Sequence, residues 1–212
     1  MKHDRTLHFG QEVHLYTMSK GLIKRINDRM DKDIKEGKII DARESLSAKI
    51  QHEYRILQWL PEMDTDEEIP KAVKHTYGEA NVDKSFLLRD IQINDAWIND
   101  QREHEYQVLH KHSGNVQVGF ASVMFLRVPD DWGEEFTETS APHNGRLSLA
   151  GNCGGLFSVK QYLVTPQVGD FYIFPYDLEH CVYPFRGPGI RRSLSINFDL
   201  NMIKGPPVKY KW

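Results

Sequence analysis

The chain has 212 residues, of which 40% are apolar and 27% are charged, and its formal net charge is −3. This composition excludes a disordered chain, allows one domain with a substantial core, and lacks the basic excess typical of nucleic-acid binding. No apolar run is long enough to cross a bilayer, and the two cysteines form no disulfide framework, so we expect a cytoplasmic protein.

The N-terminal part is predicted to be largely helical. A helix is expected to begin after Ser19, which can cap it, and to end at Gly37. Its apolar residues recur at helical spacing: Leu22, Ile23, Ile26, Met30 and Ile34. A second apolar set between Ile50 and Leu60 is compatible with helix or strand. The acidic stretch at 62–68 is expected to be a loop, and 69–77 another short helix.

From about residue 96 onward the sequence predicts strands. The candidates are 106–112, 116–128, 145–150, 156–164, 170–174, 178–185 and 191–200. Turn residues separate them, and no helical pattern intervenes. We therefore predict a mainly β, α+β fold: a double-stranded β-helix (jelly roll) with N-terminal helices packed on one face. The chain is expected to form one domain, with helical support at 1–95, the core at 96–200 and a tail at 201–212.

Three histidines are candidate metal ligands. His110 and His112 are two residues apart, so on a strand they point to the same face and can hold one ion. His180 lies on a later candidate strand and can supply a third ligand. Two ligands from one strand and a distal histidine from another are typical of facial-triad iron sites in jelly rolls.

A polar row begins at Arg191. Arg191, Ser193 and Ser195 share one face of the predicted strand, while Arg192 and Leu194 share the other. An arginine that faces the inside of a barrel needs an anionic partner, and an organic diacid can accept paired hydrogen bonds from it. The alternative is an edge strand with two surface arginines.

These motifs occur in an order that resembles a known family. The blocks are Trp97-Ile98-Asn99, Glu105-Tyr106, His110-Lys111-His112-Ser113-Gly114, Phe125 to Pro129, Gly169-Asp170, Phe174-Pro175, His180, Val182 to Phe185 and Arg191 to Ser195. Together they resemble the prolyl-hydroxylase-like 2-oxoglutarate/Fe(II)-dependent oxygenases of bacteria and bacteriophages. The resemblance covers residues 97–198, about half of the chain.

The resemblance implies a hydroxylase that uses Fe(II) and 2-oxoglutarate and releases succinate. By position, His110 and His180 are implied as metal ligands. Arg191, assisted by Ser193, is implied to bind the C5 carboxylate of 2-oxoglutarate, with Arg192 as the alternative. Tyr106 shares strand parity with His110, so we expect it to line the cofactor pocket or, alternatively, to be a core or rim aromatic. The stretch 130–138 is expected to form part of the substrate entrance.

One position departs from the family pattern. Most members have Asp or Glu two residues after the first histidine, and here that residue is His112. Either His112 is the third ligand, which parity favours, or it lies outside the ligand set. A carboxylate can then complete the site, with Asp130, Asp131, Glu134 and Glu135 as the candidates, or His112 can support the ligands from behind or contact the substrate.

Two other classes of function remain open. A cupin-like metalloenzyme with three histidines would need no oxo-acid cofactor, and a non-catalytic jelly-roll module would need no metal. For the oxygenase, the sequence leaves a small-molecule or peptide substrate open.

Overall fold

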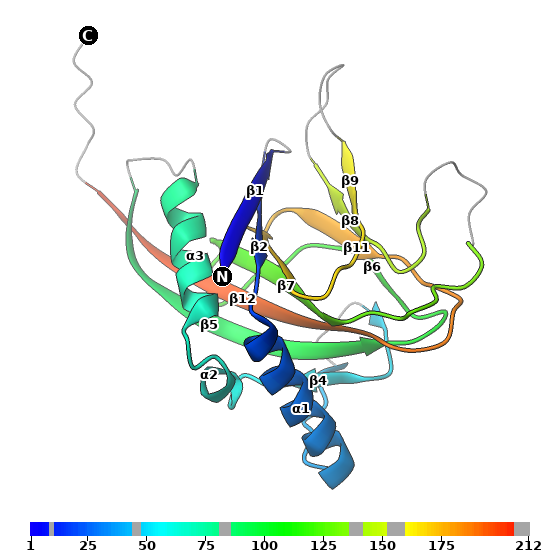
Figure 1. Cartoon of the computed structure of the whole chain (residues 1–212). Coiled ribbons are helices and arrows are strands. Elements are labelled where there is room, and N and C mark those ends of the chain that lie inside the picture. Colours follow the sequence, from blue (N-terminus) through cyan, green and yellow to red (C-terminus); the bar gives the residue numbers. More distant parts are fainter. Residues whose placement is uncertain (9–10, 44–47, 81–85, 136–141, 152–159, 206–212) are drawn as a thin grey trace.

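A computed structural model describes residues 1–8, 11–43, 48–80, 86–135, 142–151 and 160–205. Its main feature is a pair of antiparallel sheets, which Figure 1 shows with the helices gathered beside one of them. Within the described residues, no helix combines the length and the apolar character needed to span a bilayer. Cys153 lies outside the described residues, and Cys181 is a free thiol.

The larger sheet has seven strands in the order β1-β2-β10-β7-β12-β5-β4. These strands are β1 (Lys2–His8), β2 (Glu12–Thr17), β4 (Glu53–Arg55), β5 (Phe86–Gln101), β7 (Gly119–Arg127), β10 (Asp170–Pro175) and β12 (Arg191–Lys204). At its centre, β12 pairs with β7 on one side and with β5 on the other.

The smaller sheet has five strands in the order β3-β6-β11-β8-β9. They are β3 (Ala48–Lys49), β6 (Tyr106–His110), β8 (Leu147–Ala150), β9 (Gln161–Val164) and β11 (Glu179–Val182). From β5 to β12, successive strands alternate between the two sheets except at the β8–β9 pair, as expected for a double-stranded β-helix. The predicted fold class is confirmed.

The helices are α1 (Lys20–Glu36), α2 (Leu60–Met63) and α3 (Glu68–Glu79). α1 begins and ends where the sequence predicted. The Ser19 hydroxyl accepts a hydrogen bond from the Leu22 N–H, and Gly37 adopts a φ of 68° at the C-terminal end. The acidic stretch at 62–68 is only partly a loop, because α2 ends within it and α3 begins at Glu68.

Two apolar cores lie on opposite faces of the larger sheet. On one face, Leu22 and Ile26 of α1 join Leu194 and Ile196 of β12. Between the two sheets, Phe125 and Phe174 pack with residues of the smaller sheet such as Leu149. β12 therefore has one apolar face, which the helices cover, and one polar face, which looks toward the smaller sheet.

The N-terminal part contributes more strands than the sequence predicted. β2 pairs with β10, and β5 runs through residue 95 to pair with β12 along its whole length. The expected helical extension is thus partly β structure that belongs to the larger sheet. The expected boundary at residue 95 therefore falls within one continuous strand, β5.

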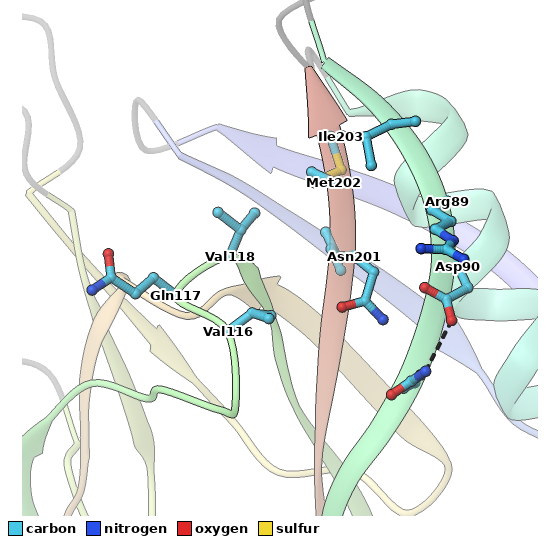
Figure 2. Close-up of a pocket in the computed structure, with 10 residues that line it drawn as sticks. Arg89, Asp90, Val116, Gln117, Val118, Asn201, Met202 and Ile203 are labelled. Atoms are coloured by element: carbon cyan, nitrogen blue, oxygen red, sulfur yellow. Dashed lines mark hydrogen bonds between the residues drawn. The ribbon is translucent and has the colours of Figure 1, made fainter. Parts of the chain in front are cut away.

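A groove lies at the far end of β5 and β12, beyond the last β7–β12 pair at Asp199. Figure 2 shows the segment Val116 to Val118 facing Asn201 to Ile203 across it, with Arg89 and Asp90 of β5 beside them. Its volume is about 660 Å³, and its described lining contains no imidazole. This groove is therefore separate from the histidine site described next.

Candidate metal centre and cofactor pocket

The three predicted histidines meet at one place. His110 is the last residue of β6, and it lies opposite His180 of β11 in the register of the smaller sheet. His112 follows two residues after the end of β6, where its N–H donates to the carbonyl of Tyr176 at 2.9 Å. The candidate ligand atoms of all three side chains lie within 4.8 Å of one another. Strand pairing thus positions two of the candidate ligands, and a loop positions the third.

Hydrogen bonds orient two of the imidazole rings. Nδ1 of His110 lies 2.7 Å from the Val108 carbonyl, and Nδ1 of His180 lies 2.9 Å from the Leu178 carbonyl. A carbonyl can only accept, so Nδ1 carries the proton in both rings and Nε2 keeps its lone pair. Backbone partners of this kind orient metal-binding histidines in proteins.

The remaining ring completes a geometry suited to an ion. Nε2 of His112 lies 3.1 Å from Nε2 of His180. Two nitrogens bound at about 2.1 Å and at right angles to one ion lie about 3 Å apart. The rings are parallel within 3°, with centroids 4.9 Å apart.

Burial keeps the imidazoles neutral. It lowers the pKa of His110, lowers that of His112 to about 3, and lowers that of His180 well below the usual value. Neutral imidazole is the form that binds a metal, so the cluster needs no proton release at neutral pH.

Arg191 is a buried cation in the same pocket. Its side chain is 1% exposed, and Nη1 donates to Oε1 of Gln101 at 3.3 Å. Within the described residues, Nε and Nη2 have no hydrogen-bond partner. The Phe125 ring lies 4.9 Å from the guanidinium carbon, and burial lowers the pKa of Arg191 to about 9. A buried charge without a counter-ion is costly, so the pocket is suited to an anion.

The pocket joins these groups. Its lining includes the three histidines, Arg191, Ser193 and Ser195, together with Trp97 and Asn99 of β5 and Ser122 of β7. No lining residue is acidic. A dicarboxylate held by Arg191 would therefore meet donors and neutral groups, with the imidazoles in the same pocket.

Arg192 has a different environment. Nε and Nη2 donate to the two carboxylate oxygens of Asp100 at 2.6 and 2.7 Å, and Nη1 donates to Asp31 at 2.6 Å. Arg192 lies outside the pocket lining. Of the two arginines that the sequence left open, only Arg191 faces the histidines.

Tyr106 is not where strand parity placed it. It is 37% exposed and does not line the pocket, whereas its neighbour Gln107 does. The reason is a bulge: His110 lies opposite His180, but Gln107 lies opposite Val182. Three residues of β6 therefore match two of β11, and the alternation of side chains shifts by one.

The candidate carboxylates lie elsewhere. Asp131 accepts a hydrogen bond from the Gly133 N–H, and Glu135 accepts from the backbone of His143 and Asn144. Within the described residues, no carboxylate joins the histidine cluster, and His112 is the third side chain of that cluster. The expected entrance at 130–138 lies partly outside the described residues.

Sequence reasoning gave no role to several lining residues. Trp97 and Asn99 entered only as part of a family resemblance, although their alternation with Gln101 puts all three on one face of a strand. Gln107 gave no signal at all, because a bulge leaves no mark in the sequence that a parity rule can use.

Together, the jelly roll, the histidine cluster and the buried arginine define a class: a double-stranded β-helix protein with a non-haem metal centre. Residues 95–197 match the family model described as "Putative 2OG-Fe(II) oxygenase". This match confirms the resemblance seen in the sequence and identifies residues 95–197 as a 2-oxoglutarate/Fe(II)-dependent oxygenase region. No curated protein matches the chain.

Solved structures share the fold at low identity. A prolyl hydroxylase from Trichoplax adhaerens, in complex with a hypoxia inducible factor peptide fragment, has a TM-score of 0.59 at 10% identity; 88% of this chain and 82% of that one are covered. HygX from Streptomyces hygroscopicus, with nickel, 2-oxoglutarate and hygromycin B bound, gives 0.57 at 9% identity over 88% and 82%. The viral collagen prolyl hydroxylase of Paramecium Bursaria Chlorella virus-1, in its 2OG complex, gives 0.56 at 12% identity over 88% and 94%.

Proposed function

We propose that the chain hydroxylates a peptide or small-molecule substrate, with decarboxylation of 2-oxoglutarate to succinate. The observation that supports this most is the buried Arg191 in the pocket of the three imidazoles, whose Nε and Nη2 have no hydrogen-bond partner within the described residues. The peptide and hygromycin B in the similar structures support these two classes of substrate.

The residues present fit the cofactors. His110, His112 and His180 would hold iron(II), and Arg191 with Ser193 would hold the distal carboxylate of 2-oxoglutarate. When bound, iron(II) and the oxo acid supply the oxidising power that turns a substrate C–H group into C–OH. The chain's own residues bind and orient the oxo acid, and apolar side chains such as Phe174 and Val182 limit water in the pocket.

A neutral third ligand distinguishes this centre. With His112 in place of a carboxylate, the bound metal site carries one more positive charge. A dianionic oxo acid offsets part of that charge, so we expect the anion to bind more tightly to the metal-loaded protein than to the metal-free protein.

The whole chain is proposed to act as one oxygenase domain. β5 contributes Trp97 and Asn99 to the pocket, and its first residues precede position 95. The strand β2 pairs with β10, next to the pocket strand β7. The N-terminal part is therefore required for the pocket as well as for the apolar core.

Anaerobic titration tests this function. We expect Fe(II) and then 2-oxoglutarate to produce the weak visible metal-to-ligand band, and succinate to be released once oxygen is admitted. His180→Ala should remove the band, whereas His104→Ala, which changes a histidine outside the cluster, should keep it. Absence of the band in the unsubstituted protein at saturating cofactor would contradict the proposal.

One observation favours an alternative. A centre of three histidines also suits a cupin-like metalloenzyme that uses no oxo acid. That enzyme would turn over with metal alone and would not respond to Arg191→Leu. A dependence of oxygen uptake on 2-oxoglutarate that is lost in Arg191→Leu separates the two functions.

A further inference from the structure

Polar side chains form a row along the inner faces of β5 and β12. The register places Gln101 opposite Arg191, Asn99 opposite Ser193, and Trp97 opposite Ser195. These are alternate residues on each strand, so their side chains point to the same side of the sheet. Arg191 stands at one end of this row and Trp97 at the other.

Trp97 brings a polar group to the metal end of the row. Its ring lies 6.0 Å from that of His112, with 28° between the planes. The side chain is 3% exposed, and within the described residues its Nε1 is buried without a hydrogen-bond partner. An indole N–H can only donate, and a buried donor that makes no bond costs free energy.

The residues around Trp97 limit which groups could accept a hydrogen bond from its indole N–H. The pocket lining offers imidazoles, hydroxyls and amides but no carboxylate. Asn99, the next side chain in the row, donates at 3.5 Å to Ser195, so its amide contact is weak and its Oδ1 is buried without a partner. The unmatched Trp97 N–H therefore borders a pocket where a ligand oxygen would satisfy it, whereas the Asn99 Oδ1 needs a donor.

We propose that Trp97 donates its indole N–H to an oxygen at the metal-side end of the 2-oxo acid. Trp97 then recognises the 2-oxo acid group that every such cofactor shares, whereas Arg191 recognises the distal carboxylate. This proposal rests on the proposed function, and it assigns the two ends of the row to the two ends of one molecule.

The experiment compares two cofactors of equal chain length. 2-Oxoglutarate and 2-oxopentanoate differ only in that a methyl group replaces the distal carboxylate. Binding of each to the anaerobic Fe(II) protein is followed by the visible band and by calorimetry. The variants are Trp97→Phe, which keeps the aromatic ring beside His112, and Arg191→Leu. Trp59→Phe is the matched control, because Trp59 lies in the core on the helix side of the larger sheet.

Each variant has a distinct expected result. Trp97→Phe should weaken both oxo acids by a similar factor, about 10-fold or more, as expected for one hydrogen bond to a charged acceptor. Arg191→Leu should weaken 2-oxoglutarate by about 100-fold or more and leave 2-oxopentanoate nearly unchanged. Trp59→Phe should change neither affinity.

Three results would overturn the role of Trp97. They are unchanged affinities in Trp97→Phe, a loss confined to 2-oxoglutarate, and an equal loss of Co(II) affinity measured without any oxo acid. The last would mean that the ring acts through His112. If the unsubstituted protein does not prefer 2-oxoglutarate and Arg191→Leu changes nothing, the proposed function fails. If only the effect of Trp97→Phe is missing, the proposed function stands and this inference falls.

Discussion

Each face of β12 carries a buried arginine, but the two arginines differ in their charged partners. Arg191 and Arg192 are adjacent, and each is 1% exposed. Arg192 points toward the helices, where Asp100 and Asp31 neutralise it. Arg191 points toward the imidazoles, where the amide of Gln101 accepts its one hydrogen bond within the described part of the chain.

This comparison teaches that burial alone does not reveal the role of a charge. Burial opposes the charged form of both arginines, but the Asp100 carboxylate holds the pKa of Arg192 above its ordinary value. The pKa of Arg191 falls to about 9 because nothing offsets its burial. A cation whose partners lie within the fold has a structural role, whereas one without such partners is suited to a ligand.

The largest expected effect is on stability, at Arg192. Arg192→Leu should lower the free energy of unfolding by about 3–5 kcal/mol, because Asp100 would remain buried without its partner. Urea denaturation measures this loss. The double variant Arg192→Leu with Asp100→Leu should regain much of it, since no charge is then left unpaired. A loss below about 1 kcal/mol in the single variant would contradict the structural role of Arg192.

The next effect is on ligand binding, at Arg191. Arg191→Leu should not lower the free energy of unfolding in the absence of ligand, because it removes a buried charge that has no counter-ion. In the anaerobic Fe(II) protein, 2-oxoglutarate at 100 times its Kd should stabilise the unsubstituted chain by about 2.7 kcal/mol. The variant should gain almost nothing at the same concentration. A clear loss of stability without ligand would instead assign Arg191 a structural role.

The smallest effect concerns pH and Asp31. Asp31 is 49% exposed. Burial raises the pKa of its carboxyl group, but Arg192 and Arg127 outweigh burial and hold that pKa below 3.8. The folded state therefore favours the carboxylate. Its stabilising contribution is present above the pKa of the unfolded chain and is lost as the pH falls through the folded pKa.

Asp31→Asn should therefore cost less than about 1 kcal/mol at pH 7, because solvent screens a half-exposed pair. The difference from the unsubstituted chain should disappear at pH values below the folded pKa. Denaturation curves at several pH values measure both quantities. A difference that persists in acid would show that the contribution of Asp31 is not electrostatic.

The sequence predicted the elements that have a regular pattern. The helix α1 has a capping serine, a helical apolar stripe and a terminal glycine, and each signal is local. The strand β5 was missed because its register shifts twice, leaving Arg89 and Asn94 outside the regular pairing. Each shift reverses which side chains face the core, so Ile91 and Ile93 do not continue in phase to Ala96 and Ile98.

The candidate site was predicted in part for the same reason. Parity correctly placed Arg191 and Ser193 on one face of β12 and Arg192 on the other, and it suggested that His110 and His112 lie together. It failed at Tyr106, where a bulge in β6 shifts the alternation. The absence of a counter-ion at Arg191 could not be predicted, because it depends on which distant residues pack around the guanidinium.

The loop position of His112 has a consequence for the chemistry of the centre. His110 and His180 lie opposite each other on paired strands, so an inserted or deleted residue at either position would disturb the smaller sheet. His112 instead lies in a loop, where its N–H donates to the carbonyl of Tyr176. The hydroxyl of Tyr176 donates to Asp199. The formal charge of the centre can therefore be altered at position 112 by exchanging one side chain, while the two sheets keep their hydrogen bonds.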